Sequence, residues 1–280
     1  MLGRELISVV ISTYNAPAFL AVSLSSFAGQ TDTGFEIVVA DDGSDARTQA
    51  VVEAARRRCA VPIRHVRHAD RGFRLSRIRN LAIGACAGTY LIFMDGDCFV
   101  LADFIAQHRR LAARGRFVSG KRSYLRAGVT RRIVAAGQAP GWGRLRWLGR
   151  SLVNQCTRPA EFVPLPDGTW RDKKAGEWRK AQACNLGVFR TDVDAVNGFD
   201  NRYAAHGLED SDFILRLIHA GVARKLGDHG PVVLHLEHPR RGDGGPSPNT
   251  PMFAALEASE VSRAADGLVE ALAEAAVNPG

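Results

Sequence analysis

The stretch YLIFMDGDCF, residues 90–99, is an apolar run that ends in two carboxylates, Asp95 and Asp97, with one glycine between them. A carboxylate is costly to bury unless something pairs with it. The two acids therefore either cap a turn or hold a cation. Carboxylate oxygens suit hard cations such as Mg²⁺ or Mn²⁺, whose sites often include phosphate oxygens and water. The stretch predicts a buried strand that ends beside a metal and a diphosphate.

Apolar segments alternate with helical patterns along the first 114 residues. The segments 6–12, 36–41, 62–68 and 90–95 are typical of buried strands. Helical patterns follow them: from Pro17 to about Gly29, from a cap at Ser44 or Asp45 to about Cys59, from a cap at Ser76 to about Ala87, and over 102–114. This alternation indicates an α/β fold with a mostly parallel sheet covered by helices on both faces.

Composition limits the class of protein. The chain has 280 residues, enough for one large domain or two modest ones, with 46% hydrophobic and 24% charged residues, as in soluble globular proteins. No apolar run approaches the roughly 18–20 residues of a membrane span. The N-terminal apolar run is interpreted as a strand rather than a signal peptide. Five scattered cysteines without a CxxC pair favour reduced thiols and a cytoplasmic location.

The formal net charge is +8, from 37 basic and 29 acidic residues. A basic surface attracts nucleic acid, phosphorylated substrates or an anionic membrane. The sequence lacks the basic and aromatic interleaving of single-strand binders, so we expect no nucleic-acid partner. A solvated basic face and a peripheral contact with the inner face of the membrane both remain open. The sequence gives no indication of the oligomeric state.

Polar residues follow three of the predicted strands. The first strand ends in Ser12–Asn15, the second in Asp41–Ser44 and the fourth in Asp95–Asp97. A turn or cap explains any one of these groups. In parallel sheets, however, ligands bind at the carboxyl ends of the strands, where all three groups would meet. Together they predict a ligand site at this edge.

Several motifs resemble a known family. STYN (12–15), VVADDGS (38–44), RGFRLSRIRNLAI (71–83) and YLIFMDGDCF look like the nucleotide-sugar half of family 2 glycosyltransferases with the GT-A fold. NGFDNRYAAHGLEDSDFILRL (197–217) resembles the acceptor-side motif of galactosyltransferase and chondroitin-polymerase type enzymes, and VVLHLEHP (232–239) resembles a late histidine segment. The order and spacing of these motifs agree across residues 6–238.

The resemblance implies a GT-A fold, a Rossmann-like, mostly parallel sheet flanked by helices with an acceptor-binding second half. We therefore divide the chain into a nucleotide-sugar-binding half, 1–120, and an acceptor-binding and catalytic half of the same domain, 121–238. Residues 239–280 begin with a run rich in proline and glycine and end with one rich in alanine and glutamate. We interpret them as a linker and a C-terminal helical segment.

The resemblance also implies how the nucleotide and the metal are bound. Thr13, Tyr14, Asn15 and Asp42 would bind the base and ribose. Asp95 would lie near the ribose and the metal, and Asp97 would ligate the metal. Relatives use a late histidine as a further ligand; His235 is the best match, and His238 is the alternative.

Arginines in the segment 71–80 are suited to the diphosphate. Arginine offers paired donors to phosphate oxygens, and the N-terminus of a helix also favours anions. Arg77 and Arg79 point to different faces of a helix, so they cannot both reach one phosphate. The resemblance favours Arg79 and Asn80, which match the Arg-Asn pair of the family, and Arg74 is a further candidate.

The predicted helix 210–220 begins with three acids, Glu209, Asp210 and Asp212. The helix dipole favours acids there by about 0.3–1 kcal/mol each, which explains one of them comfortably. The resemblance implies that Asp210 is the catalytic base and that Glu209 contacts the acceptor. It also places His206, Gly207 and Asn185 beside the acceptor or the donor sugar. His206-Gly207-Leu208 departs from the Trp-Gly-Gly or Gly-Trp-Gly of many relatives, which weakens the acceptor assignment.

These inferences predict a metal-dependent, inverting glycosyltransferase that uses Mn²⁺ or Mg²⁺ and a nucleotide sugar, UDP-linked, and requires Asp97 and Asp210 to share one site. The acceptor would be a glycan, a glycolipid or a natural product, in surface glycan biosynthesis or natural-product glycosylation. The alternatives are a nucleotidyltransferase, which also has an acidic metal site, and a non-catalytic nucleotide- or glycan-binding protein.

Overall fold

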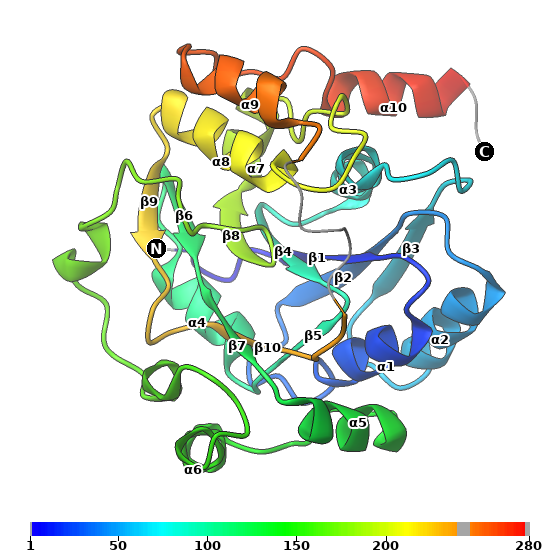
Figure 1. Ribbon diagram of the computed structural model, residues 1–280, viewed down its shortest axis with the longest axis vertical. Helices are drawn as coiled ribbons and strands as arrows, with labels where there is room; N and C mark the ends of the chain where they lie inside the picture. Colours follow the sequence, from blue (N-terminus) through cyan, green and yellow to red (C-terminus); the bar gives the residue numbers. More distant parts are fainter. Residues whose placement is uncertain (1, 240–246, 278–280) are drawn as a thin grey trace.

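A central sheet of seven strands organises the protein (Figure 1). The computed structural model describes residues 2–239 and 247–277. The strand order is β3-β2-β1-β4-β8-β6-β9. The bounds are β1 Ile7–Thr13, β2 Phe35–Asp41, β3 Ile63–Arg67, β4 Tyr90–Asp95, β6 Arg116–Ser119, β8 Asn185–Phe189 and β9 Ala223–Leu226.

The sheet is mostly parallel, as the alternation predicts. β3, β2, β1 and β4 run parallel to one another, and so do β6 and β9. β8 lies between these two groups and is antiparallel to both. The carboxyl ends of β1, β2 and β4 therefore meet at one edge, where the predicted polar groups lie.

Alternate residues of the central strands enter two different cores. In β4, Ile92 and Met94 pack on one face of the sheet while Leu91 and Phe93 pack on the other, and all four are almost fully buried. Helices cover both faces: α1 (Pro17–Ser25), α2 (Ala46–Arg56) and α4 (Phe104–Leu111) on the first, and α3 (Leu75–Ala85), α7 (Arg190–Ala195) and α8 (Glu209–His219) on the second. Burial on both faces explains why the strands are continuously apolar.

A second, three-stranded sheet joins two distant segments. β10 (Val232–His235) lies between β5 (Cys98–Val100), to which it is antiparallel, and β7 (Lys121–Tyr124), to which it is parallel. In this register His235 lies opposite Cys98, the residue after Asp97. The small sheet thus places the late histidine segment against the acidic turn that ends β4.

The caps predicted for two of the helices have different outcomes. Asp45 caps α2, since its side chain accepts a hydrogen bond from the backbone N–H of Arg47. The predicted cap at Ser76 is wrong, because α3 begins at Leu75 and Ser76 is buried inside its first turn. The helix starts at this point because the backbone N–H of Arg74 bonds to Asp42 and fixes the incoming chain.

The second half carries shorter elements. It contains α5 (Ala127–Ala136), α6 (Arg144–Leu152), and two 3₁₀ turns, η1 (Pro159–Phe162) and η2 (Thr169–Asp172). Trp147 of α6 is fully buried against Phe99 of β5, with ring centroids 5.8 Å apart. α5 and α6 therefore pack onto the small sheet. Within the residues described, no helix is long and apolar enough to cross a membrane.

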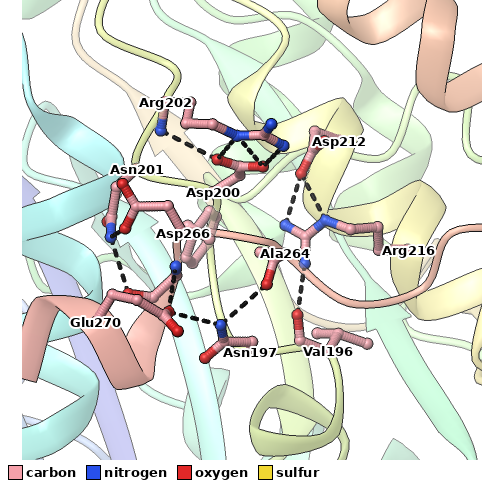
Figure 2. Close-up of polar contacts among 12 residues, drawn as sticks. Val196, Asn197, Asp200, Asn201, Arg202, Asp212, Arg216, Ala264, Asp266 and Glu270 are labelled. Carbon is pink, nitrogen blue, oxygen red and sulfur yellow. Dashed lines mark hydrogen bonds and ion pairs between the residues drawn. The ribbon is translucent and has the colours of Figure 1, made fainter.

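Two C-terminal helices, α9 (Thr250–Glu257) and α10 (Leu268–Val277), pack on the body (Figure 1). Asn197 donates to Ala264 and to Glu270, and Asn201 donates to Asp266 (Figure 2). These bonds hold the segment before α10 against the turn after α7. Residues 240–246 of the predicted linker lie outside the described part of the chain.

Gly96 permits the close contact between the acidic turn and β1. Its N–H donates to the carbonyl of Ser12 over 2.8 Å, and a Cβ atom at this position would lie 2.9 Å from the same oxygen. Gly96→Ala should therefore destabilise the protein by about 1–3 kcal/mol, as overpacking does. Gly128→Ala in α5 is the control, because nothing lies within 4 Å of its Cβ position. Equal unfolding curves for the two variants would contradict the prediction.

Candidate functional site

The polar strand ends lie side by side. Ser12 pairs with Asp95 in the β1–β4 ladder, and Thr13 pairs with Asp41 in the β1–β2 ladder. The predicted groups therefore form one continuous edge. Thr13 Oγ1 is buried without a hydrogen-bond partner, so a polar group of the site remains available there to a ligand.

Arg79 connects this edge to α8. Its side chain is 1% exposed and donates to Asp210 Oδ1 over 2.7 Å, to Ser12 Oγ over 3.1 Å and to Asp95 Oδ1 over 3.5 Å. Burial would lower the pKa of Arg79, but Asp210 and Asp95 keep it above its ordinary value. A permanent positive charge therefore lies between the strand-end acid and the acid of α8.

The start of α8 holds its two acids in different environments. Asp210 Oδ2 accepts a hydrogen bond from the N–H of Ala183 over 3.0 Å, so both of its oxygens have partners. Glu209 is 6% exposed and its Oε2 has none. Burial and the charge of Asp210 raise the pKa of Glu209 well above its ordinary value. The residue before them, Leu208, has φ +74°, a conformation that strains a non-glycine residue and recurs at functional sites.

Asp97, His235 and His238 form a cluster that can bind a metal ion, with one ligand atom from each residue and all three within 4.8 Å of one another. Asp97 Oδ2 lies 2.9 Å from His238 Nε2 and 3.6 Å from His235 Nε2. Burial lowers the pKa of His235 to about 4, which keeps its imidazole neutral. A carboxylate and two imidazoles suit a transition metal such as Mn²⁺. The residues therefore fit the expected cation.

Asp95 lies outside that cluster. Its carboxylate faces Arg79 and, at 3.7 Å, Arg122 of β7. Burial and the charge of Asp97 raise the pKa of Asp95, while the two arginines oppose this. The two acids of the D-G-D turn are therefore oriented differently, Asp97 toward histidines and Asp95 toward arginines.

A cavity of about 280 Å³ lies beside the strand ends, lined by Tyr14, Asn15, Asp42, Gly72 and Phe73. Asp42 receives hydrogen bonds from His68 Nε2 over 2.6 Å and from the N–H of Arg74 over 3.1 Å. His206 packs edge-on against Phe73 with ring centroids 5.9 Å apart. The loop before α8, including Gly207 at φ +100°, thus comes close to this cavity.

A larger cavity of about 490 Å³ is lined in part by Arg122, whose guanidinium lies 3.7 Å from the carboxylate of Asp95. Its wall carries more positive than negative charge. The basic lining residues are Lys121, Arg122, Arg158, Lys174, Lys180 and Arg224, and the acidic ones are Glu161 and Asp228. This cavity is therefore more basic than the smaller one, whose only charged lining residue, among those that the structure describes, is Asp42.

Comparison with known proteins identifies the family. The sequence profile described as "Glycosyl transferase family 2" matches residues 8–162, more than half of the chain, and that of the "N-terminal domain of galactosyltransferase" matches residues 173–239. The chain belongs to glycosyl transferase family 2.

Curated relatives of this glycosyltransferase match mainly over its first part. Chondroitin synthase of Escherichia coli is 35% identical over 92 residues, 32% of this chain and 13% of the relative. Validoxylamine A glucosyltransferase of Streptomyces hygroscopicus subsp. jinggangensis is 39% identical over 92 residues, which are 32% of this chain and 21% of the relative. YfnE of Bacillus subtilis, an uncharacterized glycosyltransferase, is 28% identical over 258 residues, and the match covers 83% of this chain and 65% of the relative. The matched part spans 9% to 27% of the first relatives.

Solved structures confirm the GT-A fold of this glycosyltransferase. A mannosyltransferase of Pyrobaculum calidifontis, in complex with GDP-Man and Mn²⁺, matches with a TM-score of 0.56 and 18% identity, covering 99% of this chain and 76% of that one. TarS of S. aureus matches with a TM-score of 0.53 and 16% identity, covering 82% and 36%.

Two sequence-predicted residues of the glycosyltransferase point away from this site. Asn80 is fully buried, and its amide bonds to the backbone of Phe199 and to Asn201. Asn185 is fully buried as well, and its amide bonds to His108, to the carbonyl of Lys121 and to a second carbonyl. Both side chains use their polar atoms to join elements of the fold, so neither is available to the nucleotide or the sugar in this arrangement.

Arg74 reaches the site mainly through its backbone. Its N–H bonds to Asp42, whereas its guanidinium bonds to the carbonyl of Ala69. Arg122 and His68 were not predicted from the sequence. Arg122 stands in no recognisable motif, but His68 directly follows β3, whose last residue Arg67 pairs with Asp41. Strand register alone would have placed His68 near Asp42.

Removal of a metal-cluster residue should weaken binding of Mn²⁺ itself. Loss of an outer-shell partner commonly lowers metal affinity 10- to 100-fold, so Asp97→Asn, His235→Ala and His238→Ala should each lower it at least about tenfold. Isothermal titration of the purified protein with Mn²⁺ measures this. His219→Ala, at the far end of α8, is the matched histidine control. An unchanged affinity in His238→Ala would remove that residue from the ligand set.

Glu209 should make stability depend on pH. Because the folded protein binds the proton of Glu209 more tightly than the unfolded chain, the free energy of unfolding should fall as pH rises above about 4.5. Glu209→Gln removes this loss, so the variant should gain stability over the natural protein between about pH 5 and about pH 8, by on the order of 1 kcal/mol. Urea unfolding of the variant and the natural protein at the two pH values measures this gain. Exposed Glu260→Gln is the control, and an equal gain in both variants would contradict the prediction.

Proposed function

We propose that the protein transfers a sugar from a nucleotide sugar, UDP-linked, to an acceptor hydroxyl with inversion at the anomeric carbon. The observation that carries the proposal is the bridge formed by Arg79. Its guanidinium contacts both Asp95, beside the metal cluster, and Asp210, at the start of α8. The proposed site for the leaving diphosphate and an acid able to accept a proton are therefore separated by a single arginine side chain.

The donor would lie across the edge of the sheet. Its base and ribose would occupy the smaller cavity, with Thr13, Tyr14, Asn15 and Asp42 as partners. The fold match to a mannosyltransferase in complex with GDP-Man and Mn²⁺ is compatible with a nucleotide-sugar donor in this family. The diphosphate would extend toward Asp95 and the cluster around Asp97.

Asp97, His235 and His238 would hold Mn²⁺ or Mg²⁺. When bound, such an ion stabilises the negative charge that develops on the leaving diphosphate. The choice of imidazole ligands favours Mn²⁺ over Mg²⁺. Arg79 and Arg122 place two positive charges beside Asp95. These charges offset the negative charge of Asp95, so the carboxylate repels the phosphate oxygens less.

The residues of α8 would act on the acceptor. Asp210 accepts the proton of the attacking hydroxyl, and its carboxylate is oriented by Arg79 and the N–H of Ala183. Glu209, with a free oxygen and a raised pKa, accepts or donates a hydrogen bond to the acceptor sugar. A single displacement by an external hydroxyl inverts the anomeric carbon and needs no enzyme nucleophile.

The acceptor would be a glycan, a glycolipid or a natural product, which the larger basic cavity could admit beside Asp95. Among the relatives, chondroitin synthase is named for a glycan and validoxylamine A glucosyltransferase for a natural product. We place the reaction in surface glycan biosynthesis or natural-product glycosylation. The five cysteines are free thiols, which supports a cytoplasmic location.

Two other functions compete with this proposal. A nucleotidyltransferase would use the acidic metal site but has no need for Asp210 and Glu209 at a second helix start. A non-catalytic binder would need neither a base nor a strained Leu208 before it. The site therefore favours sugar transfer.

Asp210→Asn should lower turnover about 10²- to 10⁴-fold, the usual contribution of a general base, while binding of UDP remains. The donor is first found by thermal shift with a panel of nucleotide sugars and Mn²⁺, since a bound ligand raises the apparent stability. Release of nucleotide from that donor then measures turnover, and titration calorimetry measures UDP binding.

Glu209→Gln separates the two acids of α8, and Glu260→Gln, exposed between α9 and α10, is the surface control. Glu209→Gln should raise the KM for the acceptor by a larger factor than it lowers kcat. Full turnover in Asp210→Asn with lost turnover in Glu209→Gln would transfer the role of base to Glu209. Full turnover in both would contradict the proposed chemistry.

A further inference from the structure

One long segment of the chain carries positive charge only. All 29 acidic residues lie outside residues 104–160, a segment that contains 13 basic residues. They are Arg109, Arg110, Arg114, Arg116, Lys121, Arg122, Arg126, Arg131, Arg132, Arg144, Arg146, Arg150 and Arg158. A solvated surface normally mixes charges of both signs, so this bias favours a negatively charged partner.

Within this segment, α6 turns apolar side chains to the solvent. Leu145 is 84% exposed, Leu152 is 72% exposed and Val153, directly after the helix, is 65% exposed. Positions 145, 152 and 153 share one face of a helix, opposite the fully buried Trp147. Three large apolar side chains that are this exposed on one face of a helix indicate a contact surface.

The same helix carries Arg146 and Arg150. The guanidinium carbons of Arg146 and Arg150 lie 4.3 and 3.8 Å from the ring centre of Trp142. Burial and the like charges of Arg146 and Arg132 lower the pKa of Arg150, so these three arginines lie close together. In the part of the chain that the structure describes, no carboxylate forms an ion pair with Arg131, Arg132, Arg146 or Arg150.

We name this surface the α6 patch: Leu145, Leu152 and Val153 with Arg132, Arg146 and Arg150. It packs on the small sheet that carries the metal cluster. Trp147 and Ile133 share one core with Phe99 of β5 and Leu234 of β10. In Figure 1, α5 and α6 lie at the lower edge of the molecule, below β7 and β10. The α6 patch is therefore coupled rigidly to the site through a continuous core.

We propose that the α6 patch seats the protein on an anionic lipid bilayer. An interfacial helix combines a short apolar stripe with flanking arginines, because the stripe enters the boundary of the acyl chains while the arginines meet lipid phosphates. The α6 patch has both features. A nucleic-acid partner would use the charge but leave Leu145, Leu152 and Val153 without a function, and a protein partner of mixed charge would leave the arginines unpaired.

Seated in this way, the small sheet and its metal cluster face a fixed direction relative to the lipid. Membrane contact does not depend on the catalytic assignment, since no residue of the α6 patch belongs to the proposed site. If the proposed function is correct, the acceptor is one held at the bilayer surface, such as a glycolipid.

Co-sedimentation with vesicles tests the α6 patch on the full chain. The protein should bind vesicles that contain 30–40% phosphatidylglycerol, roughly tenfold more tightly than vesicles of phosphatidylcholine alone, and binding should weaken steeply with salt. The triple variant Arg132→Gln/Arg146→Gln/Arg150→Gln should lose the preference for anionic lipid. Leu145→Ser/Leu152→Ser/Val153→Ser should lower binding about tenfold even at low salt.

A matched control removes the same charge elsewhere: Arg4→Gln/Arg57→Gln/Arg58→Gln, all exposed. It should keep vesicle binding. Thermal unfolding and UDP binding should be unchanged in all three variants, which separates lost membrane contact from lost folding or a failed donor assignment. Equal binding to both vesicle types, equal losses in patch and control variants, or binding of duplex DNA in place of vesicles would each overturn the proposal.

Discussion

A buried guanidinium between two carboxylates is the interaction on which the site depends. Arg79 is almost fully removed from solvent and contacts Asp95 and Asp210, which lie 115 positions apart in the sequence. Loss of one member of such a group leaves an uncompensated buried charge, typically a penalty of several kcal/mol. The arrangement therefore fixes α8 relative to the end of β4. Without it, two acids that repel one another would have no reason to lie at one edge.

Other residues of the site adopt arrangements that lower the stability of the fold. Glu209 is buried with a free oxygen beside Asp210, and Leu208 before it adopts a left-handed backbone conformation. Each feature lowers the free energy of unfolding, and neither is needed to start a helix, since a serine or aspartate cap would serve. Local destabilisation of this kind persists where the surrounding fold holds the residues in place for a function. Here the holding groups are Arg79 and the backbone of Ala183.

Much of this could be predicted from the sequence, and the failures have physical causes. Apolar continuity predicts the parallel strands because both faces of the sheet are buried, and the strand order brings Asp41 and Asp95 together. Asn80 and Asn185 were assigned by motif, but a motif does not reveal that other elements of the fold already occupy the polar atoms of an amide. The misplaced cap at Ser76 has a similar origin, since the start of α3 is fixed by a bond to Asp42 from another strand.

The choice between His235 and His238 could not be made from spacing, because it depends on where β10 ends. The strand pairs with β5 through His235, and the chain then turns so that His238 also reaches Asp97. Both imidazoles are thus presented by a sheet whose other side packs on Trp147 of α6. One small core therefore supports the metal cluster and the α6 patch together. A protein that seats α6 on lipid must, for this reason, hold its metal cluster at a constant height and angle to the bilayer, which suits an acceptor that moves in only two dimensions.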